Sequence, residues 1–584
     1  SRTGRAAALA ALGVACLSIV GFGLGGEATA ATSASPVLIV EIDATALPEL
    51  IASPPVRALV GAGDGGASLL VAATPGDPLA QLTDALGSEG RPPAIVTMRA
   101  ASTERLTAVI EPALLAVTHG PLTELPIEQG TLVVMLVTTP PPADPERLGA
   151  AAVVVGSAGS MLDALERGDG PPIERTLTSD STRRAGVVTS ADVATTAIDA
   201  SDVPVVGDPD GSTIDVVDAP PPVGLYERYL DQRRLAVPVG IVTGLYAFAA
   251  GLLGLILVLA RAGSPRVRTF AAWAAIAVVP ITAGLMLVGH LDRLTYASVF
   301  AFLAAVAAVA VLAMALVRRD AGSLAAIAAL GAGLLVVFAV EAALGWTATL
   351  TPLLGGAQLD GGRFFGLPNV QIGLLMGASL YVAQRLPSTG AGVVLILAAA
   401  LFAGLPWTGS NIGAAVTIAA AAGIWWGLRA DEGRLRPGTI LRVLATVAGT
   451  VALVVVAHRY LTDVPTHISR FASDTGGVVG LWDKFVDRLG VGADLIARNP
   501  FGLIPILGIL ATLWLVLRPP SGLRSSLSAH PAWRDALVTI LLGSVIAYVA
   551  NDSGAAAIGL GFGTALGGLL YVSLTDAPAK MEAA

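Results

Sequence analysis

The stretch Leu-Asp-Gly-Gly-Arg-Phe-Phe-Gly-Leu-Pro-Asn at residues 359–369 lies between two long apolar runs of the chain. A connector between two membrane spans needs only polar turn residues, whereas this one holds Asp360, Arg363 and Asn369 among three glycines and a proline. Glycine admits tight turns and proline fixes φ, so the loop can hold charged side chains in a defined shape. The stretch predicts a membrane protein whose connectors take part in its function.

The composition places most of the chain in lipid. Hydrophobic residues make up 54% of the sequence and charged residues 13%, with a mean hydropathy of +0.74, whereas a soluble domain carries about 25% charged residues. A net charge of −8 argues against a nucleic-acid partner, which would need a basic surface. The single cysteine, Cys16, excludes a disulfide framework within the chain and a cysteine-based metal site. No P-loop, dinucleotide fingerprint, His-Glu-x-x-His motif or nucleophile elbow is evident in the sequence, so we expect no cofactor.

Apolar runs follow one another at regular spacing after residue 235. Runs of this length and composition predict membrane-spanning helices. We expect spans at 236–260, 269–289, 295–317, 323–345, 366–384, 390–405, 411–428, 439–457, 501–517, 535–550 and 554–574. Residues 236–574 are therefore predicted to form a polytopic α-helical bundle of about 11 spans, with a long external connector at 458–500 and a cytoplasmic tail at 575–584.

Arginines gather in alternate connectors of this predicted bundle. One side holds Arg261, Arg266, Arg268, Arg318, Arg319, Arg385, Arg429, Arg434, Arg436, Arg518, Arg524 and Arg534. The short connectors of the other side hold Arg293 and Arg363. Cytoplasmic loops carry the excess of basic residues, so residues 31–235 are predicted outside the cytoplasm and the C-terminus inside. We expect a multi-pass protein of the cell (inner) membrane with a large extracytoplasmic domain.

The part of the chain before the bundle has two sections. Residues 1–30 contain Arg2 and Arg5, an apolar run and Ala28-Thr29-Ala30, a pattern typical of a signal peptide or an N-terminal transmembrane anchor. Residues 31–235 alternate strand-like runs with helical stretches, which predicts an α/β domain with a mostly parallel sheet covered on both faces. The strand-like runs lie at 37–42, 68–72, 94–98, 131–137 and 151–155.

Two segments of this domain resemble the alkaline-phosphatase superfamily. Residues 36–43 read Pro-Val-Leu-Ile-Val-Glu-Ile-Asp, and residues 187–196 read Val-Val-Thr-Ser-Ala-Asp-Val-Ala-Thr-Thr. In that superfamily a strand ending in Asp delivers a metal ligand, and a late strand–helix turn often carries Asp-hydrophobic-Ala-Pro-Thr. Asp43 matches the first position, and Asp192 begins a match to the second that lacks the proline. The fusion to a polytopic half resembles uncharacterised actinobacterial membrane proteins, in which connectors similar to 360–369 and 551–554 recur.

The departures from that superfamily imply a degenerate domain. Its two-metal phosphatases need about six Asp or His ligands, because paired cations stabilise the attacking and leaving oxygens. The predicted domain contains one histidine, His119, and residues 156–159 read Gly-Ser-Ala-Gly where family enzymes place an Asp-His pair. The resemblance therefore implies a pseudoenzyme domain, and we expect no metal site.

Three connectors on the arginine-poor side predict a common site. They cover residues 360–369, 406–411 and 551–554. The candidate substrate-binding residues are Asp360, Arg363, Asn369, Asn411, Asn551 and Asp552. Arg363 beside a glycine-rich backbone and a helix N-terminus would suit a phosphate or carboxylate. Three alternatives need no ligand: an Asp360–Arg363 ion pair, a helix cap supplied by the connector 406–411, and capping of the last helix by Asp552 or Ser553. No catalytic residue is indicated.

Glu341 is an ionisable residue within an apolar span. Intramembrane carboxylates are costly and face a cavity or the protein interior. Glu341 is therefore a candidate proton or cation site, and a carboxyl group that is hydrogen-bonded to neighbouring helices is the alternative.

The sequence as a whole predicts a cell-envelope membrane protein that binds a phosphate-bearing or lipid-linked precursor at its extracytoplasmic face, for translocation or transfer. Membrane lipids, a lipid-linked envelope precursor and other envelope proteins are the expected partners. Two alternatives stay open: an outer-leaflet transferase or phosphatase, and an envelope scaffold. A polar cavity joining Glu341 to both faces would favour transport, and one open only outward would favour an enzyme.

Overall fold

The structure of this chain is a computed structural model. It describes residues 37–42, 47–62, 64–71, 95–100, 131–138, 148–167, 170–201, 212–355, 358–360, 364–462, 490, 503–551 and 555–576. Several predictions fall outside these residues: the signal or anchor at 1–30, the C-terminal tail beyond 576, and most of the connector 458–500.

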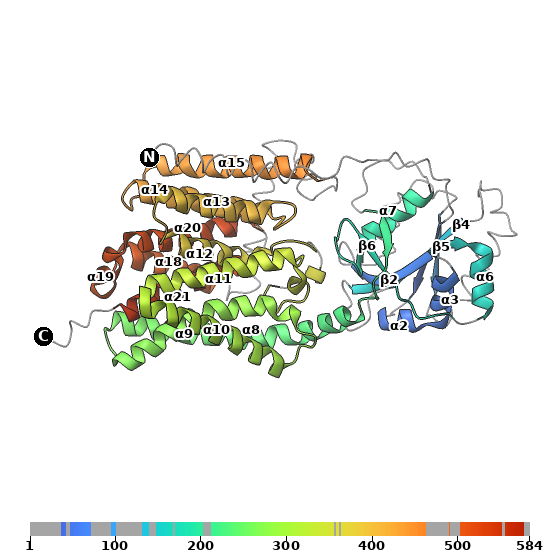
Figure 1. Cartoon of the computed structure of the whole chain (residues 1–584), viewed down its shortest axis with the longest axis horizontal. Helices are drawn as coiled ribbons and strands as arrows, with labels where there is room; N and C mark the ends of the chain where they lie inside the picture. Colours follow the sequence, from blue (N-terminus) through green and yellow to red (C-terminus); the bar gives the residue numbers. More distant parts are fainter. Residues whose placement is uncertain are drawn as a thin grey trace.

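The α/β domain is built on a six-stranded mixed sheet (Figure 1). Its strands, in spatial order, are β3 (Ile95–Ala100), β1 (Val37–Ile42), β4 (Thr131–Thr138), β5 (Leu148–Ser157), β2 (Asp64–Val71) and β7 (Val187–Thr189). Each of the five predicted strand-like runs overlaps one of these strands. The prediction was a mostly parallel sheet, and the observed sheet is mixed: β1 is parallel to β3 and β4, and β2 is parallel to β7, whereas β5 is antiparallel to both β4 and β2. The segment 139–147 that joins β4 to β5 is shorter than the dozen or so residues that a parallel crossover requires.

Alternating residues of the strands fill two cores, one on each face of the sheet. Leu38 and Val134 belong to the core under α2 (Leu47–Ala52), α3 (Pro54–Ala62) and α6 (Ala158–Arg167). Ile39 and Val133 belong to the core under α7 (Ser190–Ser201). Successive side chains of a strand point to opposite faces, so a sheet with both faces covered needs such continuous apolar strands. A small second sheet pairs β6 (Thr176–Ser179) with β8 (Ile214–Val217).

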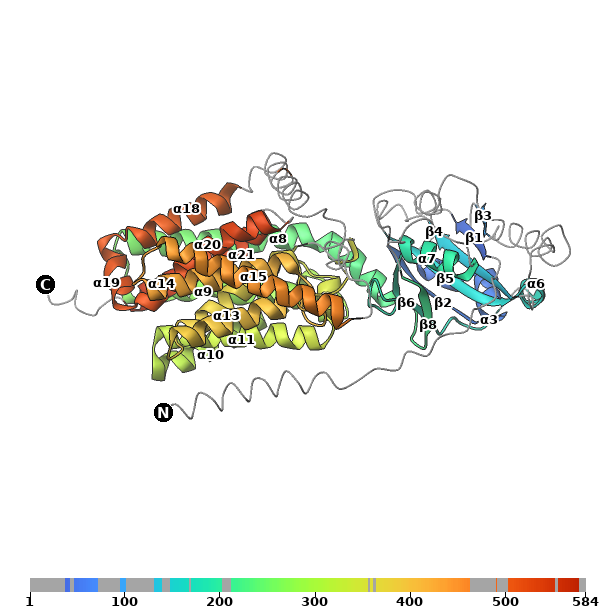
Figure 2. The same cartoon turned by 90° about the horizontal axis from the view of Figure 1, so that it is seen from above.

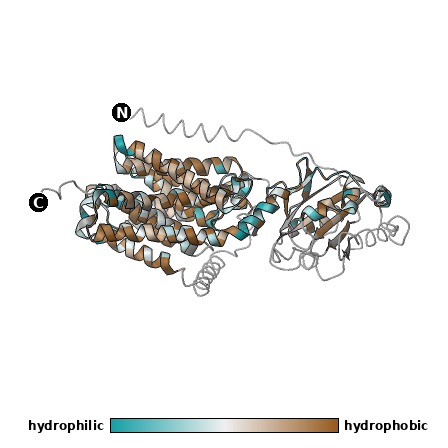
Figure 3. Cartoon of the chain, turned by 90° about the horizontal axis from the view of Figure 1, so that it is seen from below, coloured by the Kyte–Doolittle hydropathy of each residue, from teal (hydrophilic) through white to brown (hydrophobic). Residues whose placement is uncertain are grey.

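The second half of the chain is a bundle of helices with long apolar surfaces (Figures 1 and 3). Its helices are α8 (Val223–Leu259), α9 (Pro265–Leu287), α10 (Tyr296–Ala321), α11 (Ser323–Ala343), α12 (Ile372–Ala383), α13 (Thr389–Gly404), α14 (Ile412–Ala430), α15 (Pro437–Tyr460), α18 (Leu503–Leu517), α19 (Ser521–Ala529), α20 (Pro531–Ala550) and α21 (Ala555–Thr575). Every predicted span coincides with one of these helices. Within the described residues, eight helices are long and apolar enough to cross a membrane, and α12, α13 and α18 are shorter apolar helices. The chain therefore carries a polytopic helical bundle of the multi-pass membrane type.

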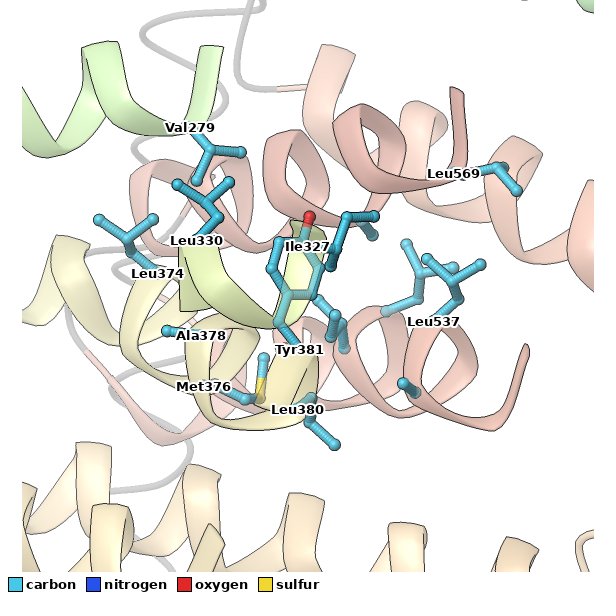
Figure 4. Close-up of a cluster of buried hydrophobic side chains, with 14 of the residues drawn as sticks. Val279, Ile327, Leu330, Leu374, Met376, Ala378, Leu380, Tyr381, Leu537 and Leu569 are labelled. Atoms are coloured by element: carbon cyan, nitrogen blue, oxygen red, sulfur yellow. The ribbon is translucent and has the colours of Figure 1, made fainter. Parts of the chain in front are cut away.

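Apolar side chains cover the outside of this bundle as well as its interior. Leu245 and Phe248 of α8 are 64% and 60% exposed. A water-soluble bundle would turn such a face inward, whereas lipid solvates it. The interior is equally apolar: Tyr381 of α12 lies among Ile327, Leu330 and other aliphatic side chains (Figure 4). Its hydroxyl donates to the backbone oxygen of Thr564 on α21, so its polar atom is paired.

A single helix joins the two halves. α8 begins at Val223, and its first turns pack Leu225, Tyr226 and Tyr229 into the core of the α/β domain. The predicted boundary between residues 235 and 236 lies inside this continuous helix. Figures 1 and 2 both place the α/β domain beyond one end of the bundle, which we call the domain end. The arginine-rich connectors between α8 and α9, α10 and α11, and α14 and α15 lie at the opposite end, the far end.

Candidate functional site

Two of the predicted amide side chains meet at the domain end. Asn411 precedes α14 and is buried, and its side-chain amide donates to Oδ1 of Asn369 (2.7 Å) and to the backbone oxygen of Leu367 (2.9 Å). Its own Oδ1 accepts the backbone N–H of Ala414 at 3.0 Å and caps α14. The cap that the sequence predicts is therefore present, and the same side chain ties the loop 364–369 to the start of α14.

Asn551 lies against the first turn of the same helix. Its side-chain amide donates to the backbone oxygen of Ala547 (3.0 Å) and to Oγ1 of Thr417 (3.4 Å). A Cβ atom at Gly413 would collide with Oδ1 of Asn551, so this approach requires glycine there. Asn369, Asn411 and Asn551 thus gather around the start of α14; we call these three residues the amide cluster.

Gln371 adds to this region, and the sequence analysis missed it. It ends η6 (Asn369–Gln371), just before α12, and its side chain is fully buried. Neither Nε2 nor Oε1 has a hydrogen-bond partner in the part of the chain that the structure describes. An unpaired buried amide is costly, and a bound water or ligand would offset that cost. The signal in the sequence was its position, two residues after Asn369 in the same connector.

The side chains of three predicted site residues are not among those that the structure describes. Asp360 ends η5 (Gln358–Asp360), and only its backbone is described. Arg363 and Asp552 lie outside the described residues. The Asp360–Arg363 pair, the phosphate contact of Arg363 and the cap by Asp552 or Ser553 therefore stay predictions.

Glu341 is buried in the last turn of α11, with 2% of its surface exposed. One carboxylate oxygen, Oε1, pairs with Nε2 of His290 in η3 (Val288–His290). The other oxygen, Oε2, has no hydrogen-bond partner within the described chain. The carboxyl group is therefore hydrogen-bonded to a neighbouring element, which is the alternative that the sequence left open beside a proton or cation site. Only one of its two oxygens takes part in that bond.

Two adjacent arginines dock the α/β domain onto the domain end of the bundle. Arg183 and Arg184 follow β6, and Arg183 donates from Nη1 to the backbone oxygen of Pro406 (2.7 Å). Arg184 donates from Nε to Phe364 O (2.9 Å) and from Nη2 to Trp346 O (3.0 Å). Neither residue was predicted as a contact from the sequence, because nothing local separates this pair from Arg233-Arg234 on α8.

Burial controls the electrostatics of this contact. It lowers the pKa of Arg184 from 12.5 to about 10, and the charge of Glu341 opposes that change. Burial also lowers the pKa of Arg183, whose guanidinium lies 5.0 Å from the centre of the Phe365 ring. Buried guanidinium groups without a nearby carboxylate would be costly. The charge of Glu341 favours the ionised form of Arg184, and the charge of Asp180 favours that of Arg183.

Trp346 connects these features. It is fully buried and adopts φ +64°, and its backbone N–H donates to the backbone oxygen of Glu341 (2.7 Å). Its indole N–H donates to the backbone oxygen of Thr408, in the connector that leads to Asn411. The end of α11, the arginine contact and the connector 406–411 therefore share one residue.

Asp192, which matches a position of the late superfamily segment, caps a helix in this structure. Its carboxylate accepts hydrogen bonds from the hydroxyls of Ser179 (2.8 Å) and Ser181 (2.6 Å). It also accepts the backbone N–H groups of Thr189 (2.8 Å) and Ser212 (2.9 Å). Thr189 Oγ1 in turn accepts the N–H of Asp192, which completes a reciprocal cap at the start of α7. These four donors occupy the lone pairs that a metal ion would use.

Other features of the α/β domain add no further candidate. A groove of about 600 Å³ is lined by Gly65, Glu174, Asp218 and their neighbours, and includes no predicted site residue. Asp43 lies outside the described residues, and within those that are described no group of three His, Cys, Asp or Glu side chains could hold a metal ion. Comparison of the chain with protein-family models, with curated proteins and with solved structures gave no match.

Proposed function

We propose that this protein sits in the inner membrane of a cell envelope and binds a phosphate-bearing or lipid-linked precursor at the domain end of its bundle, for translocation or transfer. The α/β domain would lie on the extracytoplasmic side and the C-terminus in the cytoplasm. The arginines at the far end support this orientation, since basic connectors stay in the cytoplasm.

The observation that carries the proposal is the meeting of three separate connectors in one polar region. The amide cluster comes from residues that begin or end three different helices. Gln371 stands two residues from Asn369, and neither of its polar atoms has a partner among the described residues. Amide groups donate to phosphate oxygens and also accept from hydroxyl groups. A bound headgroup would satisfy Gln371, and the apolar chain of a lipid would lie against the exposed apolar faces of the bundle.

The α/β domain would hold or guide the substrate. Arg183 and Arg184 attach it to the same connectors, 364–369 and 406–411, that carry the amide cluster. Asp192, the aspartate that matches the late superfamily segment, is committed to the cap of α7. These contacts support a pseudoenzyme, and a descent from the alkaline-phosphatase superfamily stays a prediction.

Binding to the full-length protein in lipid nanodiscs tests the proposal. A short-chain polyprenyl phosphate is the probe, measured by native mass spectrometry. We expect saturable binding that Gln371→Leu weakens by about tenfold or more, because loss of one hydrogen bond to a charged group exceeds 1.4 kcal/mol. The matched control is Gln384→Leu at the other end of α12, whose amide donates to Leu324 O and Tyr381 O.

Gln384→Leu should lower the stability of the protein and leave its binding of polyprenyl phosphate unchanged. Phosphatidylglycerol in the same assay separates a site for the polyprenyl headgroup from a general affinity for anionic lipid. Absence of saturable polyprenyl phosphate binding, or equal binding by the parent and Gln371→Leu, would contradict the proposal.

A further inference from the structure

The connector between α14 and α15 carries a surplus of positive charge at the far end of the bundle. Residues 429–442 contain four arginines and two acidic residues, and the start of α20 adds Arg534 and Asp535. The five arginines and three acidic side chains give this region a formal net charge of +2. We call its five arginines the arginine cluster: Arg429, Arg434, Arg436, Arg442 and Arg534.

One buried carboxylate serves two members of the cluster. Asp535 is 2% exposed and accepts from Nη2 of Arg534 (3.0 Å) and from Nη1 of Arg429 (3.3 Å). About a third of each arginine side chain is exposed, 33% for Arg534 and 31% for Arg429. A guanidinium group has five N–H donors, so each keeps donors for a further acceptor. Among the described residues of this ion-pair group, one positive charge is left over.

Arg442 lies on the second side of the cluster, next to an exposed tryptophan. It donates from Nη1 to Oδ2 of Asp431 (2.8 Å), and its Cζ lies 5.8 Å from the centre of the Trp426 ring. Trp426 is 41% exposed. Exposed tryptophans of membrane proteins gather at the level of the lipid headgroups. The stacked pair therefore presents guanidinium donors at that level.

The turn between α14 and α15 joins these two ion-pair groups. The two helices pack side by side (Figure 1), and Asp431, at the start of the turn, binds Arg442. Gly433 lies against Arg534, because a Cβ atom there would overlap Nη2 of that arginine. Arg434 and Arg436 follow in the turn; both are exposed and make no ion pair within the described chain. The turn thus gathers paired and unpaired guanidinium groups in one place.

Apolar side chains continue from the cluster along the outside of α15. Ile440, Leu441 and Leu444 are 63%, 69% and 60% exposed. In a membrane protein lipid chains cover such a face. A soluble anion would meet the arginines and gain nothing from this surface, whereas a phospholipid uses both.

We propose that the arginine cluster binds the phosphate group of an anionic phospholipid in the leaflet at the far end of the bundle. Basic pockets between membrane helices bind such headgroups. Arg434, Arg436 and Arg442 donate to the phosphate oxygens, Trp426 supports Arg442, and an acyl chain lies along α15. The site is at the opposite end from the amide cluster and does not depend on the function proposed there.

The test measures lipid retained by the full-length protein. The protein is released from nanodiscs that contain phosphatidylglycerol and phosphatidylcholine, and bound lipid is identified by native mass spectrometry. We expect saturable binding of phosphatidylglycerol and none of phosphatidylcholine. Arg434→Gln combined with Arg436→Gln should weaken this binding by about tenfold or more, since each arginine near the membrane surface attracts anionic lipid.

The matched control removes the same charge from other connectors of the far end. Arg266→Gln combined with Arg319→Gln replaces two exposed arginines, and should bind phosphatidylglycerol as the parent does. A second pair, Asp431→Asn with Arg442→Gln, keeps the net charge and replaces the ion pair by two amides that can still bond. Its binding should also fall by about tenfold, because the guanidinium donors beside Trp426 are lost.

A photoactivatable phosphatidylglycerol with a diazirine near its headgroup locates the site. Cross-links should map to residues 426–444 and to the start of α20. Equal binding of the two lipids by the parent would overturn the proposal. An equal loss of binding in the Arg266→Gln, Arg319→Gln control would overturn it too, since general attraction to the basic end would then explain the result. So would cross-links confined to other segments. If the Asp431→Asn, Arg442→Gln protein fails to accumulate, the exposed pair at 434 and 436 decides with its control.

Discussion

Asn411 and Gln371 are two buried amides at the domain end that differ in how fully they are bonded. Asn411 caps α14 and makes two further hydrogen bonds, so the fold depends on it. Both polar atoms of Gln371 are unpaired in the described chain, so the fold gains nothing from them. At the residue scale, this difference separates a side chain kept for structure from one available to a ligand.

Leucine substitutions should expose that difference. Asn411→Leu removes a helix cap and the hydrogen bonds to Asn369 and Leu367, at a cost of about 2–4 kcal/mol. Gln371→Leu removes unpaired polar atoms at nearly constant volume and should be neutral or stabilising. Thermal unfolding of the purified variants checks both. A Gln371→Leu protein that unfolds as early as Asn411→Leu would show that Gln371 is bonded in the empty protein.

At the scale of elements, α7 shows why a motif match can mislead. The segment 187–196 folds as a strand followed by a helix, as its resemblance to a superfamily turn implies. The Asp at its start serves the helix itself, through a cap and two serine hydroxyls. A strand–helix turn needs a cap whether or not it binds a metal, so this Asp carries no information on catalysis.

Asp192→Ala should therefore destabilise the α/β domain by about 3–5 kcal/mol, because it leaves several buried donors without an acceptor. Asp199→Ala, on an exposed position of the same helix, should change stability by less than about 0.5 kcal/mol. The measurement is the unfolding transition of the full-length protein with and without zinc. A zinc-dependent rise in stability that Asp192→Ala abolishes would instead identify Asp192 as a ligand.

On the scale of the whole molecule, the α/β domain sits at the end of the bundle opposite the arginine-rich connectors (Figures 1 and 2). α8 runs without a break from the core of the domain into the bundle. The two halves are held together by this helix, by the apolar contacts of Leu350 and Leu359 with the domain core, and by Arg183 and Arg184.

Accessibility in intact cells tests the orientation of the chain. In the Cys16→Ser background, a cysteine at Glu166 of the α/β domain should react with a membrane-impermeant maleimide. Cysteines at Ser264 and Arg434, in the far-end connectors, should react only after the membrane is permeabilised. Labelling of Ser264→Cys but not Glu166→Cys in intact cells would reverse the proposed orientation.

The sequence by itself determined the positions of the helices and of the main strands. An apolar run of sufficient length must form a helix in lipid, since its backbone groups have no other partners there, and buried strands need continuous apolar runs. Both signals are local, so the predicted spans and strand runs coincide with elements of the structure. The helix cap predicted for the connector 406–411 is a local signal too, and Asn411 provides it.

Only the tertiary structure decided which of these elements meet. His290 and Glu341 are 51 residues apart in sequence, and Arg184 and Trp346 are 162 apart. The direction of β5, the docking through Arg183 and Arg184, and the burial of Gln371 likewise depend on what lies next to each residue in space. Hydropathy and spacing show that a side chain is polar or buried, but not which partner it has. The energy of a buried charge or amide is set by that partner, and so the chemistry of the domain end comes from the packing of distant segments.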